Sequence, residues 1–523
     1  MAGRGLRAGP VAAACLCAIA APVQADTLEE ALRQAYLTNP TIEGARAQQR
    51  VTDETVAIER SGGRPSASAQ GTYTEFVKQN AASFTAPERS LTGQLNLAVP
   101  IYSGGAIRNA VRAAETRVLA GRAELRGTES ALFSQVVAAY MDVILQEALV
   151  ALNANNVEVL GINLQATQDR FQIGDLTRTD VAQSEARLSL ARSDLRTVQA
   201  NLITARETYI ALVGEAPTDL QAPPPLPNLP DSVAVAVAAA LENNPDLIAA
   251  QERADAAFYD IDVAGAGRLP QLEAFTTGGY TNFLNSLGAG VINVPIPQVQ
   301  TTVQAGVRAT IPLYQGGRPA AQERQAQARA SQALEQVVAV ERDVIQQVRG
   351  AYAAWLAANA IIASTQAAVS AAELGLEGVR AEQTVGNRQI LDVLDAEQEL
   401  LQARAQLVTA RRTEYVAGFT LLAAMGRAEA EDLNLAEAGP LYDPTVYYED
   451  VRGSIWDWRR DPDPETRATR TIEIPAQTAD IPGGMEELPL IDEPLSPTTF
   501  GAPYGIRTTD VPPSDVDIRE QPQ

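Results

Sequence analysis

Apolar residues recur every seven positions along two long stretches of the chain. The first series is Val111, Val118, Leu125 and Leu132. The second series is Val181, Leu188, Leu195, Leu202 and Tyr209. A seven-residue period is typical of α-helices that pack side by side and supercoil with a left hand. The sequence therefore predicts a long helix ending near 172 and a second one after it, joined by a sharp turn around Gly174 into an antiparallel hairpin.

A shorter helical pattern comes first, at 26–62, and Asn39-Pro40 interrupts it. The period then changes to two. Residues 91–99 and 303–311 alternate apolar with small or polar side chains, which is typical of strands with one apolar face. Preceding strands are expected at 66–74 and 271–281, with polar loops at about 76–90 and 282–300. Strands of about ten residues can cross a bilayer at a tilt; an ordinary sheet covered by helices is the alternative.

The pattern occurs twice along the chain. The motif PIYSGG at 100–105 returns as PLYQGG at 312–317, and Gly174 and Gly214 return as Gly386 and Gly426, each pair 212 residues apart. Three landmarks at one offset indicate two copies of one structural unit. We assign the copies to 26–214 and 232–427, separated by a proline-rich linker at 215–231. The acidic, proline-rich extension 428–523 is predicted to be largely disordered, with a tethered start at 442–458.

Residues 1–25 have the features of a secretory signal peptide: two arginines, a short apolar core and a small-x-small cleavage site before Asp26. A lipoprotein with Cys15 as the acylated residue is the alternative, although it leaves the apolar core short. Both cysteines, Cys15 and Cys17, lie in this leader. The mature chain is therefore expected to leave the cytoplasm without disulfides.

Composition narrows the chemistry further. The formal net charge is −23 and Lys78 is the only lysine, so the chain has no basic patch for nucleic acid. It has no histidine and no cysteine after the leader, which removes the commonest metal ligands and nucleophiles. We expect no cofactor, no metal and no enzymatic activity. The uncharged stretch 350–372 is long enough to span a membrane, but its alanines and polar residues favour a helix buried among other helices.

The strand count has a physical consequence. Each chain offers four candidate strands, and a sheet in lipid cannot leave its edges unpaired. Single-chain membrane barrels begin at about eight strands. If these strands face lipid, several chains must contribute to one barrel.

The two copies, the junction motifs and the second tip, VGNRQILDVLDA at 385–396, resemble the TolC family of outer-membrane efflux and type I secretion channels. The resemblance covers about 26–427. It implies a mainly α fold in which duplicated helical hairpins form an α-barrel, and a homotrimer whose four strands per chain make a twelve-stranded barrel in outer-membrane lipid. It implies a passive exit duct through the periplasm for drugs, small molecules or secreted proteins. It also implies a periplasmic adaptor and an inner-membrane transporter of the ABC or RND type as partners.

The resemblance also implies a gate at the helical tips. Asp392 and Asp395 resemble the acidic rings of the periplasmic constriction. Three residues apart on a helix, they share one face; the alternative is that they only favour the positive end of the helix dipole.

Arg388 resembles the residue that links neighbouring hairpins, with Asp180 and Thr179 as its partners. Gln383 stands where the family prototype has a tyrosine. The turns at Gly174 and Gly386 are the expected docking points for the adaptor. A periplasmic coiled-coil scaffold or adaptor without a membrane barrel is the competing interpretation of the whole chain.

Overall fold

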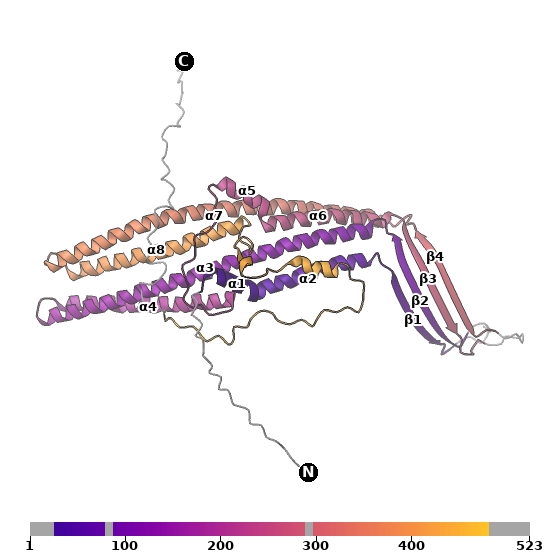
Figure 1. Ribbon diagram of the computed structural model, residues 1–523, viewed down its shortest axis with the longest axis horizontal. Coiled ribbons are helices and arrows are strands. Elements are labelled where there is room, and N and C mark those ends of the chain that lie inside the picture. Colours follow the sequence, from indigo (N-terminus) through magenta and orange to yellow (C-terminus); the bar gives the residue numbers. More distant parts are fainter. Residues whose placement is uncertain (1–25, 79–86, 288–295, 481–523) are drawn as a thin grey trace, which may run out of the picture.

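The computed structural model describes residues 26–78, 87–287 and 296–480. The predicted leader at 1–25 and the central parts of both polar loops lie outside the described residues, as does the end of the extension at 481–523. Two long helical hairpins and a four-stranded sheet make up the molecule (Figure 1). The predicted mainly α fold with a small β part is confirmed.

Each copy opens with two short helices. They are α1 (Leu28–Thr38) and α2 (Pro40–Ser61) in the first copy, and α5 (Val233–Asn243) and α6 (Pro245–Gly265) in the second. The break between them has the same cause in both copies. Proline fits only the first turn of a helix, and the Asn39 side chain accepts a hydrogen bond from the N–H of Thr41 at 2.8 Å, capping the helix that begins there. Asn244 caps α6 in the same way.

The long helices are duplicated in length as well as in sequence. The first hairpin consists of α3 (Ala106–Gln172) and α4 (Arg178–Val213), and the second of α7 (Arg318–Thr384) and α8 (Ile390–Ala424). Both α3 and α7 have 67 residues. Each follows a Gly-Gly pair with positive φ, so the chain turns sharply from strand into helix at the repeated motif. At Gly104 a Cβ atom would lie 2.8 Å from the Cβ of Leu269, which excludes other residues there.

The sheet contains β1 (Ser66–Glu75), β2 (Arg89–Tyr102), β3 (Gln271–Asn282) and β4 (Val299–Thr310), all antiparallel and in chain order. Leu95 pairs with Ala69 on one side and Gly278 on the other, and the face that they share carries most of the apolar residues of the four strands. The opposite face is mostly polar and carries an ion pair between Arg308 and Glu273 at 3.6 Å, with the Arg308 guanidinium over the ring of Phe275. The alternation predicted from sequence is confirmed.

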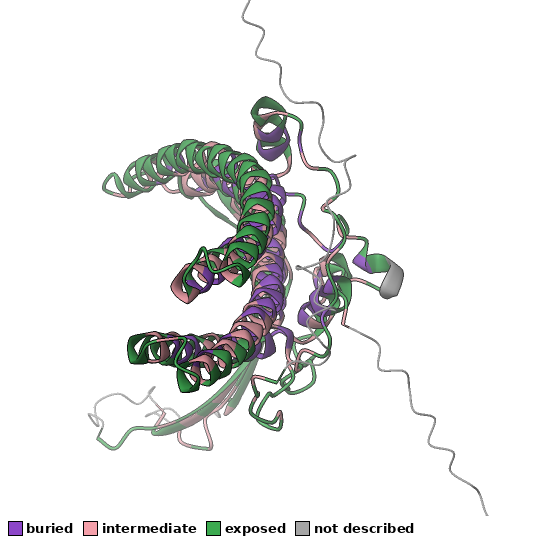
Figure 2. Ribbon diagram, turned by 90° about the vertical axis from the view of Figure 1, so that its left-hand side faces the viewer, coloured by how far each residue is buried: buried purple, intermediate pink, exposed green. Residues whose placement is uncertain are grey.

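The core lies where the hairpins meet the short helices. Phe133 and Tyr140 of α3 are fully buried beside residues of α1, α4 and α8. Viewed along the long axis, the helices form a curved wall with an open concave side, and the irregular segments lie on the convex side (Figure 2). A 3-10 turn, η1 (Ala266–Arg268), follows α6.

The C-terminal extension differs from the expectation of disorder, because 428–480 lies against the body. It forms η2 (Leu435–Ala438) and α9 (Pro444–Val451), and Tyr448 packs with Val56 and Val118. The backbone N–H of Tyr442 donates to the hydroxyl of Tyr36 at 3.0 Å. Aromatic contacts of the expected kind therefore hold the start of the extension, and hydrogen bonds to α2 and α4 continue them.

One described helix, α3, contains a stretch long and apolar enough to span a membrane, and α5 with α6 passes the same test as a bent pair. The α3 stretch is 61% buried inside the molecule, as in the core helix of a folded protein. The uncharged stretch 350–372 was expected to be buried, but it lies in α7, where it buries one narrow stripe and exposes the rest. A single chain provides no cover for that side of α7.

Candidate functional site

The two helical tips have nearly the same backbone turn. Gly174 has φ +84° and Gly386 has φ +80°, a left-handed conformation that favours glycine. The N–H of each glycine donates to the carbonyl oxygen three residues earlier, at 3.0 Å in the first tip and 3.1 Å in the second. Both turns are exposed. The expected tip turns are therefore present at the predicted residues, with the glycines fixing their geometry.

At the first tip, Asp180 acts as a helix cap. Its Oδ2 accepts the backbone N–H of Thr177 at 2.8 Å and the Thr177 hydroxyl at 2.8 Å. Thr177 in turn accepts the N–H of Asp180, which completes a capping box. These hydrogen bonds, first from the backbone and then from the side chain, hold the pKa of Asp180 below its usual range. Thr179 lies beside it and is exposed.

At the second tip, Arg388 pairs with its own hairpin. Its Nε lies 2.7 Å from Oε2 of Glu382. Asp392 accepts the backbone N–H of Gln389 at 3.0 Å and so caps α8. The carbonyl oxygen of Gln383 accepts the N–H of Gly386. Within one chain the structure thus does not bring Arg388 to Asp180 or Thr179, because each charged group already has a partner in its own hairpin.

The second expected gate residue, Asp395, joins the two hairpins. It forms an ion pair with Arg187 of α4 at 2.5 Å. The preceding residue, Leu394, is buried against Leu160 and Leu188 of the first hairpin. The contact couples the position of one tip to that of the other, and the sequence did not reveal it.

A buried carboxylate strengthens this link. Glu397 of α8 accepts hydrogen bonds from Arg380 of α7 at 2.9 Å and from Asn163 of α3 at 3.0 Å. Further from the tips, Arg412 of α8 binds both oxygens of Asp142 of α3, at 2.8 and 3.1 Å. The sequence shows charged residues beside the row of small residues in α8, which could have indicated such contacts. It does not show which helices provide the partners.

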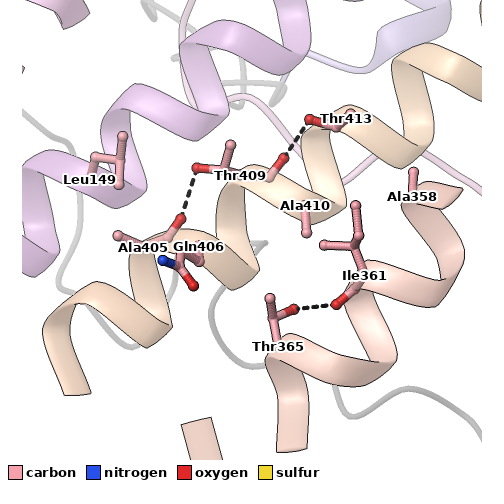
Figure 3. A pocket seen from close by; sticks show the side chains of 9 residues that line it. All are labelled: Leu149, Ala358, Ile361, Thr365, Ala405, Gln406, Thr409, Ala410 and Thr413. Atoms are coloured by element: carbon pink, nitrogen blue, oxygen red, sulfur yellow. Dashed lines mark hydrogen bonds between the residues drawn. The ribbon is translucent and has the colours of Figure 1, made fainter. Parts of the chain in front are cut away.

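A groove of about 470 Å³ opens where α8 faces α7 and α3 (Figure 3). Its lining is small or apolar, with Leu149, Ile361 and three threonines among the residues. The hydroxyls of Thr365, Thr409 and Thr413 each donate to a carbonyl oxygen of their own helix at 2.8 Å. The groove is therefore a packing seam in which the three threonine hydroxyls are satisfied by their own helices. Within the described ranges no cluster of His, Cys, Asp or Glu could hold a metal ion.

Comparisons with known proteins agree with this geometry. The family model described as outer membrane efflux protein matches residues 31–215 and 236–427, the two copies. The outer membrane efflux protein BepC of Brucella suis is 34% identical over 438 residues, which are 84% of this chain and 93% of BepC. The outer membrane protein TolC of Escherichia coli is 26% identical and covers 78% of this chain and 84% of its own.

Solved structures of similar fold include CusC, with a TM-score of 0.65 and 20% identity over 76% of this chain and 92% of that one. The outer membrane protein VceC of Vibrio cholerae has a TM-score of 0.63 and 23% identity over 76% and 96%. At such low sequence identity, the solved structures support only the fold. The family match shows which family the chain belongs to. The chain belongs to the outer membrane efflux protein family.

Proposed function

We propose that three copies of this outer-membrane efflux protein close into one passive exit duct. A periplasmic adaptor and an inner-membrane transporter of the ABC or RND type would deliver the cargo. The relatives include proteins named for efflux, such as BepC, and for secretion, such as the alkaline protease secretion protein AprF of Pseudomonas aeruginosa. Both small molecules and secreted proteins are therefore candidate cargoes.

One observation carries this proposal. The surfaces through which the two copies pack against each other have equivalents at the two edges of the chain, and these equivalents are uncovered. β2 of the first copy pairs with β3 of the second, whereas β1 and β4 each pair on one side only. An unpaired strand edge in lipid would leave its backbone groups unsatisfied, at several kcal/mol each. By the rule that joins β2 to β3, β4 should pair with β1 of the next chain.

The helices follow the same rule. α3 of the first copy packs against α6 of the second, with ion pairs from Arg117 to Asp260 and from Glu124 to Arg253. Adding the repeat offset of 212 to Glu124 of the second pair gives Gln336 in α7. Subtracting the offset of 205 from Arg253 gives Gln48 in α2. Both residues are exposed in the single chain. We expect them to face each other across the boundary between chains.

Crosslinking tests this arrangement. The leader carries both native cysteines, so the mature protein with Gln48→Cys and Gln336→Cys should have one reactive pair per boundary. A short bismaleimide added to cells should give a ladder that ends at three chains on a denaturing gel. Each single variant is the matched control and should give no ladder. Monomer alone from the double variant, or a ladder beyond three, would contradict the proposal.

The gate is the second part of the proposal. In a ring of three, Asp392 and Asp395 would supply six carboxylates near the axis at the narrow end. Arg388 and Glu382 are exposed, so Arg388 can exchange that partner for Asp180 or Thr179 of a neighbouring hairpin at little cost. Gln383 and the turns at Gly174 and Gly386 would complete the latch and the docking surface. A periplasmic scaffold without a barrel is not favoured, because the sheet exposes a whole apolar face.

A further inference from the structure

The C-terminal extension reaches the point where the helices give way to the sheet. Arg60 of α2 donates to the carbonyl oxygen of Arg452 at 3.1 Å, and Arg64 donates to that of Ser454. Ser66, two residues after Arg64, begins β1. Figure 1 shows α9 alongside α2 and the chain turning back toward the tips beyond it. The family match ends at 427, before this segment begins.

Three large apolar side chains stand in solvent at this turn. Ile455 is 77% exposed, Trp456 70% and Trp458 83%. They include two of the three tryptophans of the chain. The third, Trp355, is half-buried and donates to Glu414 at 3.3 Å. Exposing two neighbouring indoles and an isoleucine to water is unfavourable, because burying apolar surface stabilises a protein.

The arginines around these side chains are already paired locally, and Asp457 between the two indoles adds a negative charge. Arg452 pairs with Glu449 at 2.9 Å, Arg459 pairs with Asp450, and Arg460 pairs with Asp463 at 3.3 Å. No cluster of free cations accompanies the indoles in the described part of the segment. Whatever covers them is therefore recognised through aromatic and apolar contact more than through charge.

The neighbouring surface indicates what covers them. At the same end of the helices, the junction motifs expose Ile101 and Tyr102, and again Leu313 and Tyr314. Tyr102 pairs with Leu272 and so continues the apolar face of the sheet, which in an outer-membrane protein meets lipid. Trp and Tyr concentrate where a membrane meets water, because the ring is apolar and its N–H or O–H remains hydrated. The irregular segments, this one among them, lie on the convex side of the helical wall (Figure 2).

We propose that Ile455, Trp456 and Trp458 form a membrane anchor that inserts into the periplasmic leaflet of the outer membrane, at the depth of the lipid headgroups. The anchor holds the extension against the base of the barrel and fixes the height of the helical body below the membrane. It rests on the proposed function in one respect, that the sheet crosses the bilayer. Since its arginines are paired within the segment and Asp457 is acidic, anionic lipid should not promote insertion.

Tryptophan fluorescence of the full mature chain in lipid vesicles tests the anchor. Trp355→Phe leaves Trp456 and Trp458 as the only reporters. We expect a blue-shifted emission and a loss of intensity with lipids brominated just below the headgroup. The loss should be smaller when the bromines lie near the chain ends, and anionic lipid should not increase it.

A reporter in the sheet separates this proposal from the proposed function. Leu95→Trp, in a chain that also carries Trp355→Phe, Trp456→Phe and Trp458→Phe, places one indole on the apolar face of β2. If brominated lipid quenches that reporter while acrylamide in the water quenches Trp456 and Trp458, the anchor is refuted and the barrel stands. If both quenchers leave Trp456 and Trp458 unaffected, protein covers them, which also overturns the anchor. A sheet reporter that lipid does not quench would reject the membrane barrel itself.

Discussion

Replacing Glu129 with glutamine should make the attachment of the C-terminal extension independent of pH. Glu129 lies on α3 beneath the extension, where its Oε1 accepts the backbone N–H of Ala430 at 2.5 Å. Burial raises the pKa of this carboxyl to about 7, while the hydrogen bond from Ala430 acts in the opposite direction. Glutamine keeps an oxygen for the Ala430 N–H and removes the titration.

The magnitude follows from the shift. The pKa of Glu129 rises from 4.5 to about 7. At 1.36 kcal/mol per pKa unit, ionising this carboxyl costs about 3 kcal/mol more in the attached state than in water. The attached state prefers the protonated form, so its extra stability is complete below about pH 4.5. That stability is lost as the pH rises toward 7 and is constant above it. If detachment returns Glu129 to water, its equilibrium constant should rise by about two orders of magnitude across this range.

Hydrogen exchange at the Ala430 amide measures this equilibrium. Glu129→Gln is the matched control, since the intrinsic exchange rate of the Ala430 amide changes with pH in the same way in both proteins. The protection factor of the parent is divided by that of the variant at each pH. This ratio should fall between pH 5 and pH 7 and then level off. Equal pH dependence in parent and variant would refute the reasoning, because it would mean that Glu129 does not titrate between the two states.

Three further changes test other contacts. Arg388→Ser should loosen the closed tip and raise single-channel conductance in planar bilayers; unchanged conductance and gating would count against the latch. Asp392→Asn with Asp395→Asn keeps an acceptor for the helix cap but removes the charge, so block by multivalent cations should weaken; equal block would reject the ring. Arg206→Met should destabilise the chain by about 3–5 kcal/mol in thermal unfolding, because Arg206 lies 2.7 Å from Glu147 and both side chains are nearly buried. Adding Glu147→Leu should recover most of that loss, and a small loss in the single variant would argue against a buried pair.

The sequence was a good guide wherever local chemistry decides the backbone. Asn39-Pro40 ends one helix and begins the next because proline lacks an N–H and asparagine caps. The Gly-Gly junctions lie where the alternating pattern changes to the heptad pattern, and the structure turns there. The equal lengths of α3 and α7 followed from one constant offset. In each case the responsible residues are neighbours along the chain, so a single sequence contains the whole cause.

Contacts between hairpins could not be read in this way. A heptad series shows which face of a helix is buried, but not which helix covers it. The pair between Arg187 and Asp395 joins positions 208 residues apart, and both look like ordinary surface charges. Glu397 is buried only because Arg380 and Asn163 converge on it. The structure departs from the expected disorder at 428–480 for a related reason, since an acidic, proline-rich segment can still bind when Tyr442 and Tyr448 pack on the body.

The unequal burial of the two long helices completes the argument for a ring. α3 and α7 have the same length and equivalent places in the two copies, yet α3 has 22 buried residues and α7 has 8. The difference lies in position, because α3 has the second copy beside it and α7 is at the edge of the chain. A neighbouring chain on this side of α7 would cover exposed apolar side chains there, such as Leu334, Val338 and Leu356. Because the uncovered surface repeats one that is covered, the contact between chains should copy the contact within a chain, and the tips with Asp180 and with Arg388 would alternate around the gate.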